Sequence, residues 1–152
     1  MNRPEKIISG GQTGADQGGL EAGRLLGIPT GGTAPVGFIT DEGPNLDLIS
    51  YGLVPGPPDP RVFPLRTIKN VKDSDGTVWF GNPNSPGGRL TLNTCKRVGR
   101  PYIVNPSPQD LSRWVSNNHI KVMNVAGNRE RKSPGIKQRV IKILSEAFEG
   151  LD

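Results

Sequence analysis

Cysteine, histidine and aromatic residues are scarce in this 152-residue sequence, which has one Cys, one His and 5% aromatic residues. A single cysteine, Cys95, excludes an intramolecular disulfide and leaves a cysteine-based zinc site without a second ligand. No apolar run approaches the roughly 20 residues that a membrane-spanning helix requires, and residues 1–5 lack the apolar segment of a signal peptide. We therefore expect a cytoplasmic protein without a disulfide, a metal site or contact with a membrane.

The two scarce reactive side chains are poorly placed for catalysis. Cys95 has no histidine near it in the sequence, so we interpret it as a buried core residue rather than a nucleophile. His119 lies in a polar stretch and is expected to be exposed. No catalytic residue is assigned on this basis.

Glycine and proline are abundant, with 21 and 15 residues, whereas only 33% of the chain is hydrophobic. This composition favours many ordered turns between short elements over long helices. Disorder is the competing interpretation, but compact apolar runs such as 77–80 and 102–104 recur along the chain. Because 152 residues can bury one core but are too few for two ordinary domains, we expect a single domain over residues 1–152.

Positive charge predominates in the sequence. Lys and Arg outnumber Asp and Glu by 19 to 14, and the resulting net charge of +5 favours anionic partners. The basic residues are scattered apart from Arg129, Arg131 and Lys132, and they are not interleaved with aromatic residues as on a nucleic-acid-binding surface. We therefore expect a small anionic metabolite as the partner, ahead of nucleic acid.

Strands and helices alternate over most of the chain. The predicted strands are 6–9, 77–80, 102–105 and 121–125, and the predicted helices are 16–26, 67–72, 89–98 and 109–118. A last helix is expected to begin with Ser133 as N-cap and Pro134 as its first residue. Residues 28–64 are rich in proline and lack periodicity, so they are predicted to form a long ordered loop. The alternation indicates a three-layer α/β domain with a largely parallel sheet, whose ligand site lies at the carboxyl ends of the strands.

A glycine-rich segment, residues 10–14, joins the first predicted strand to the first predicted helix. The backbone N–H groups of such a loop can approach a phosphate, and the helix start adds about half a positive charge. A plain tight turn is the alternative, but Gln12, Thr13 and Asp16 favour a ligand site because they gather polar side chains at a strand end. The segment lacks the Lys and Ser or Thr of a Walker loop, and no acid stands about 20 residues further on, so neither common nucleotide pattern fits.

Small and apolar residues suggest an assembly. The first helix carries Gly18 and Gly19 on a small-residue face that allows close approach to a sheet or to another subunit. Apolar residues such as Leu46, Leu48 and Ile49 near the long loop are hard to cover within one small domain. We therefore expect a homo-oligomer.

Three further segments concentrate candidate ligand residues. Residues 66–77 combine donors and carboxylates before a strand, with a solvated turn as the alternative. Residues 86–91 repeat the glycine-rich helix start, and Arg129 could bind phosphate in a bidentate manner, unless it only pairs with a neighbouring Glu. The predicted ligand-binding residues are Gly10, Gly11, Gln12, Thr13, Gly14, Asp16, Arg66, Asn70, Ser74, Asp75, Gly76, Thr77, Gly87, Gly88, Arg89, Thr91, Gly127, Arg129 and Glu130.

With these segments the sequence resembles the family of molybdenum-cofactor carrier proteins, within the Rossmann-like nucleotide-binding group related to lysine-decarboxylase-like and DNA-processing proteins. The resemblance spans nearly the whole chain. It rests on GGQTGAD at 10–16, on RT, NV and SDGT within 66–77, and on NVAG, RE and PGI within 124–136. It implies an open α/β sheet, a homo-oligomer and a ligand held across the loops after the first, third and last strands. That ligand is expected to be the molybdenum cofactor, a phosphorylated pterin, or a nucleotide.

The sequence departs from this group at two places. Family members commonly follow the second strand with Gly-Gly-Trp, whereas Thr33 follows Gly31 and Gly32 here, so an aromatic surface is absent at that point. Related enzymes that remove ribose phosphate from nucleotides carry a Pro-Gly-Gly-x-Gly-Thr-x-x-Glu loop, in which Leu90 and Thr94 of this chain replace the last Gly and the Glu. The resemblance therefore implies that the phosphate loop is partly kept and that the acid is lost.

Two functions remain open at this point. The first is a binding protein for a phosphorylated pterin or nucleotide, acting as a carrier, sensor or sponge. The second is a nucleotide hydrolase that uses Asp16, Asp75 or Glu130 as general acid or base. We favour the binding protein because Thr94 stands where the related enzymes have their acid.

Overall fold

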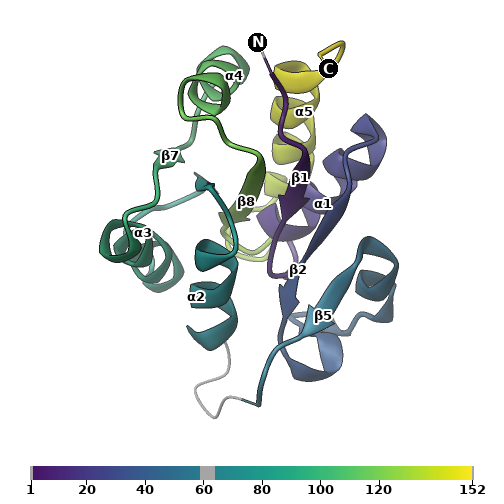
Figure 1. Ribbon diagram of the computed structural model, residues 1–152. Helices are drawn as coiled ribbons and strands as arrows, with labels where there is room; N and C mark the ends of the chain where they lie inside the picture. The colour runs from purple at the N-terminus through teal and green to yellow at the C-terminus, as the bar shows by residue number, and fades with distance from the viewer. Residues whose placement is uncertain (1, 59–63, 152) are drawn as a thin grey trace.

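The computed structural model describes residues 2–58 and 64–151, and a six-stranded parallel sheet forms its centre (Figure 1). The strand order is β5-β2-β1-β8-β6-β7, and each pairing between neighbours is parallel. The strands are β1 (Lys6–Ile8), β2 (Thr30–Ala34), β5 (Leu53–Pro55), β6 (Gly76–Phe80), β7 (Tyr102–Val104) and β8 (Val122–Gly127).

Helices cover both faces of this sheet and confirm the predicted three-layer Rossmann-like fold (Figure 1). One face carries α1 (Ala15–Leu26), α4 (Pro108–Asn117) and α5 (Ile136–Phe148), and the other carries α2 (Pro64–Lys72) and α3 (Pro86–Val98). Successive residues of a strand point to opposite faces. Val78 and Phe80 of β6 therefore join the core beneath α4 and α5, whereas Thr77 and Trp79 lie towards α2 and α3.

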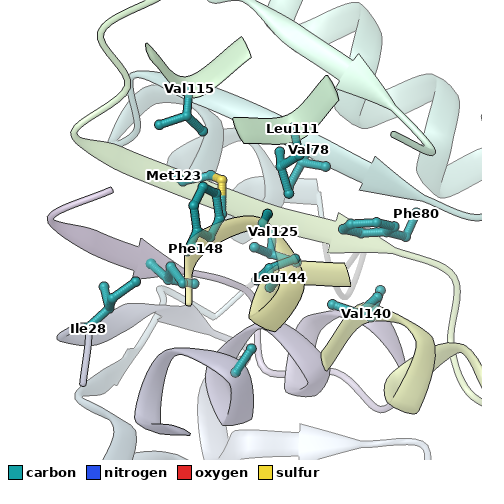
Figure 2. Packing of buried hydrophobic residues seen from close by; sticks show 14 of the residues in the cluster. Ile28, Val78, Phe80, Leu111, Val115, Met123, Val125, Val140, Leu144 and Phe148 are labelled. Atoms are coloured by element: carbon teal, nitrogen blue, oxygen red, sulfur yellow. The ribbon is translucent and has the colours of Figure 1, made fainter. Parts of the chain in front are cut away.

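The face beneath α1, α4 and α5 is closed by an apolar core (Figure 2). Val125 of β8 is fully buried there, together with Val140, Leu144 and Phe148 of α5. The i, i+4 and i+8 spacing of these α5 residues puts them on one stripe of the helix, as the sequence predicts. This stripe faces the sheet and anchors the C-terminal part of the domain.

Two glycines of α1 allow the helix to lie unusually close to its neighbours. A Cβ atom at Gly18 would be 3.0 Å from Val140 Cβ on α5, and one at Gly19 would be 2.7 Å from Val125 Cβ on β8. Real Cβ contacts are rarely so short, so α1 can lie this close only because both positions are glycine. The small-residue face is therefore covered within the domain, which removes it as an argument for a second subunit.

The prediction of a long loop over residues 28–64 is wrong. This region contains β2 and β5, the short antiparallel strands β3 (Ile39–Thr40) and β4 (Gly43–Pro44), and the 3₁₀ helices η1 (Val36–Phe38) and η2 (Leu46–Tyr51). The physical reason lies in β2, whose sequence TGGTA has no bulky apolar side chain to signal a strand. A Cβ atom at Gly32 would overlap the Ser9 carbonyl, so this glycine permits the strand to approach β1. Residues 59–63 of the proline-rich segment lie outside the described residues.

The predicted start of the last helix is also wrong. Helix α5 begins at Ile136 after Gly135, which has a left-handed φ of 87°. The Ser133 hydroxyl instead donates to Asn128 Oδ1 at 3.3 Å. The carboxylate of Glu130 accepts the Gly135 N–H at 2.6 Å and the Lys137 N–H at 3.1 Å. Glu130 therefore caps the start of α5, although it precedes the helix by six residues.

The remaining predictions of burial and secondary structure agree with the structure or differ from it only at the ends of helices and strands. The thiol-bearing Cys95 is fully buried in α3, and His119 is exposed. Helices α2 and α3 begin three residues earlier than predicted, at Pro64 and Pro86. Within residues 2–58 and 64–151, no helix is long and apolar enough to cross a membrane.

Candidate functional site

A cavity of about 320 Å³ lies at the carboxyl ends of β1, β6 and β8, between the sheet and helices α2 and α3. From β1 the chain continues to β2, towards one edge of the sheet. It later forms β6 and β7 towards the other edge, so the cavity lies where the strand order reverses. Parallel α/β sheets bind ligands at such a point. A hollow of about 430 Å³ lies at the opposite end of the sheet, near Arg3 and His119, but it lacks this relation to the strand ends.

The cavity brings together residues that are far apart in the sequence. From the predicted set it is lined by Gly10, Gln12, Asp16, Arg66, Asn70, Gly87, Thr91, Gly127 and Arg129. It is also lined by residues outside that set, namely Pro64, Thr67, Trp79, Pro86, Leu90, Asn124 and Ala126. Of these, Pro64 and Trp79 also lie outside the segments that the sequence singles out. Strand alternation could have revealed Trp79, because it shares a face with Thr77 two residues earlier.

An ion pair between Asp16 and Arg66 closes one side of the cavity. Asp16, in the first turn of α1, is 5% exposed, and its Oδ2 lies 3.6 Å from Arg66 Nη1 on α2. The same oxygen accepts the Gln12 N–H at 3.2 Å. A Cβ atom at Gly10 would overlap the Arg66 guanidinium, so the glycine makes room for this pair. Two elements on opposite faces of the sheet thus meet through one buried contact.

Burial governs the ionisation of this pair. It raises the pKa of Asp16 from 3.8 to about 6, while Arg66, the Gln12 N–H and Arg129 oppose that rise. Burial also lowers the pKa of Arg66, and the carboxylate of Asp16 opposes this change. Asp16 therefore changes its charge near pH 6, in a cavity wall where that charge would repel an anion.

A second arginine, Arg129, enters the cavity from the segment after β8. Its Nη1 lies 2.7 Å from Asp41 Oδ1, and its side chain is 31% exposed. Asp41 does not line this cavity, so the lining itself carries Arg66 and Arg129 against Asp16. The two guanidinium groups supply donors for an anionic ligand, which would compete with Asp41 for Arg129.

The two glycine-rich helix starts differ in their access to the cavity. At α3, Pro86 and Gly87 line the cavity, and the Gly88 N–H is bonded to the Ser85 hydroxyl at 3.2 Å. At α1, the Ala15 N–H donates to the Asn128 carbonyl at 3.2 Å, and a Cβ atom at Gly14 would lie 2.6 Å from the Glu130 nitrogen. The segment after β8 thus packs over Gly14 and Ala15 at the start of α1, while Asp16 of the same turn lines the cavity. The start of α3 is the helix start that opens on the cavity.

Several predicted residues lie near the cavity without lining it. Gly11 has a φ of 77° and packs against Leu48, and Arg89 is exposed on α3. Thr13 lines a separate hollow of about 210 Å³ with Asp41 and Glu130. Their predicted roles as ligand contacts remain predictions.

The structure does not bring residues 74–77 to the cavity. They begin β6 at the opposite end of the sheet, where Asp75 Oδ2 accepts the N–H groups of Lys121 at 3.0 Å and Val122 at 2.8 Å. Asp75 thus fastens the start of β8 to the start of β6. Since Glu130 is bonded to the start of α5, Asp16 is the member of the three proposed catalytic carboxylates that lines the cavity.

Comparison with known proteins agrees with this geometry. The model of the circularly permutated YpsA SLOG family matches residues 7–148. The chain belongs to this family. A solved structure, that of the "Putative molybdenum carrier protein" from Syntrophus aciditrophicus, has 33% sequence identity and a TM-score of 0.86, with 95% of each chain covered. No curated protein matches the chain. These findings confirm the predicted resemblance to molybdenum carrier proteins of the Rossmann-like SLOG family.

Proposed function

We propose that this SLOG-family protein binds a small phosphorylated ligand in the cavity, as a carrier, sensor or sponge. A molybdenum-cofactor-like pterin or a nucleotide is the proposed class of ligand. The name of the similar structure, a molybdenum carrier protein, supports a role in ligand binding. The cavity supports an anionic ligand independently of that name.

The observation that carries the proposal is that Arg66 and Arg129 line the same cavity as the start of α3. Arginine presents a planar fork of donors that matches phosphate oxygens. A helix start adds N–H donors and about half a positive charge. We place the phosphate between Arg129 and Gly87, where both contributions meet.

We further propose that the ligand is bound without being processed. Thr94, which replaces the acid of the related hydrolases, donates its hydroxyl to the Leu90 carbonyl at 2.7 Å and is buried. Asp16 lines the cavity, but Arg66 and the Gln12 N–H already hold its carboxylate. A pKa near 6 would let Asp16 exchange a proton, so Asp16→Asn is the variant that distinguishes binding from hydrolysis.

Two matched arginine variants test the binding site. Arg129→Gln should weaken binding of nucleoside monophosphates at least tenfold by calorimetry, because it removes a charge-assisted contact worth about 1.5–3 kcal/mol. Arg131→Gln is the control, since Arg131 also pairs with Asp41, at 3.6 Å, but lies outside the cavity. Equal losses in both variants would show that the effect comes from Asp41 and would refute this phosphate site.

Chromatography of free base tests the absence of turnover. The protein incubated with nucleoside monophosphates should bind them and release no base. Base release that disappears in an Asp16→Asn variant would instead establish the nucleotide hydrolase.

A homo-oligomer remains part of the proposal. Leu46 and Ile49 of η2 are 66% and 56% exposed, and Val54 of the edge strand β5 is 54% exposed. A second copy would cover these apolar side chains. Light scattering should give a mass above one subunit, and a monomer at micromolar concentration would contradict it.

A further inference from the structure

One wall of the cavity is apolar. Trp79 of β6 and Ala126 of β8 are register partners, so their side chains leave the sheet side by side. Leu90 and Pro86 of α3 line the same cavity. A Cβ atom at Gly87 would lie 3.7 Å from the Trp79 ring, which places the indole against the start of α3. The apolar wall thus adjoins the proposed phosphate site.

The indole of Trp79 carries a polar group without a partner. The side chain is buried, with 2% of the residue exposed, and its Nε1–H has no hydrogen-bond acceptor among the described residues. Buried indole N–H groups usually find a partner, because an unmet donor loses its bonds to water. An acceptor on the same face of β6, Thr77 Oγ1, is bonded to Asn124 Nδ2 at 3.2 Å and not to the indole.

We propose that Trp79 recognises a flat heteroaromatic ring in the ligand and donates a hydrogen bond to a ring nitrogen or carbonyl oxygen. This inference rests on the proposed function, since the phosphate of the same ligand would occupy the site at Arg129 and Gly87. A nucleobase and a pterin share the required chemistry, namely a planar apolar face with acceptors at its edge. Inorganic phosphate and plain sugar phosphates lack it.

The chain offers a direct optical readout for this ring. It has two tryptophans, and Trp114 lies on α4 with its ring against Gly76, at the start of β6 and away from the cavity. In a Trp114→Phe variant, Trp79 is therefore the remaining tryptophan. Guanosine 5′-monophosphate, neopterin monophosphate and ribose 5-phosphate are suitable probes, because the first two carry a ring and the third does not.

The expected result is a difference between ring-bearing and ringless probes. Guanosine monophosphate or neopterin monophosphate should shift the Trp79 emission and bind at least tenfold more tightly than ribose 5-phosphate. Trp79→Phe keeps an aromatic ring but removes the donor, so it should reduce this advantage about fivefold, as expected for one hydrogen bond. The affinity for ribose 5-phosphate should stay unchanged, which also shows that the variant is folded.

Failure of this inference differs from failure of the proposed function. Equal affinity for ringed and ringless phosphates, or an unchanged ratio in Trp79→Phe, would overturn ring recognition while leaving phosphate binding intact. No binding of any of the three probes would overturn both. A preference for the nucleotide or for the pterin would support the inference and identify the ring.

Discussion

The two faces of the central sheet differ in the side chains that are buried against them. Beneath α1, α4 and α5, apolar side chains such as Val125 and Leu144 fill the space completely. Beneath α2 and α3, apolar residues such as Trp79 share the space with buried polar residues, as in the pair of Asn124 and Thr77. Asn70 of α2 bonds to both the N–H and the carbonyl of Thr33, at 2.9 Å and 3.0 Å, so polar contacts hold that layer to β2. The first face supplies stability, and the second leaves room for a ligand.

The largest effect should come from breaking the apolar face. Leu144→Ala should lower the free energy of unfolding by about 2–5 kcal/mol, because it leaves a cavity in a closely packed core. Leu90→Ala on the cavity wall should cost less than about 1 kcal/mol, since the space beside Leu90 is already open. Urea unfolding of both variants measures the difference. Equal costs would contradict the division between a filled and an open face.

A smaller effect is expected at the junction of the two faces. Gly10→Ala puts a methyl group into the space of the Arg66 guanidinium without requiring a positive φ. Displacing one partner of the buried Asp16–Arg66 pair should cost about 1–3 kcal/mol of unfolding free energy and weaken phosphate binding. Gly87→Ala is the steric control for the unfolding measurement, because a Cβ atom there meets Trp79 at an ordinary 3.7 Å. It is not a control for binding, since Gly87 adjoins the proposed phosphate. A stable Gly10→Ala variant with normal binding would show that the ion pair is dispensable.

The smallest effect concerns pH. Asp16 has a folded pKa near 6, above its ordinary value, so its ionisation costs stability as the pH rises through that range. The ionised carboxylate also repels an anion in the same cavity, by about 1 kcal/mol for unit charges roughly 4 Å apart in water. Sulfate, which stays dianionic, should therefore bind about fivefold more weakly at pH 7.5 than at pH 5.

Asp16→Asn provides the control for this pH dependence. The variant cannot ionise at position 16, so its sulfate affinity should be flat over the same range. Calorimetric titration at several pH values gives the comparison. An identical slope in both proteins would assign the pH dependence to another group.

The sequence predicts most of the fold because apolar periodicity and glycine stops are local signals. Gly27 and Gly99 directly follow the predicted helices 16–26 and 89–98, and they end α1 and α3 in a left-handed conformation. Strand β2 was not predicted because it joins the sheet through close backbone approach at Gly32. No pattern of side chains in the sequence indicates such an approach. Local patterns also place a carboxylate near a loop without showing which N–H groups it will meet.

The candidate site was predictable only in part for the same reason. Arg66 and Arg129 belong to segments that the sequence singles out, and the fold brings both to one cavity. Asp75 and Glu130 look equally functional in sequence, yet each is bonded to the start of a neighbouring strand or helix. Trp79 looked like an ordinary strand residue. Strand alternation puts it on the face of Thr77, but its place beside Ala126 in the cavity also depends on the alignment of β6 with β8.

Mass spectrometry of the ligand that co-purifies with the native protein tests the central claim most directly. The claim is that the polar face holds a phosphorylated ligand through Arg129. The released ligand should contain phosphate, and its yield should fall sharply in Arg129→Gln while staying unchanged in Arg131→Gln. A ligand without phosphate, or one retained equally by both variants, would contradict the claim.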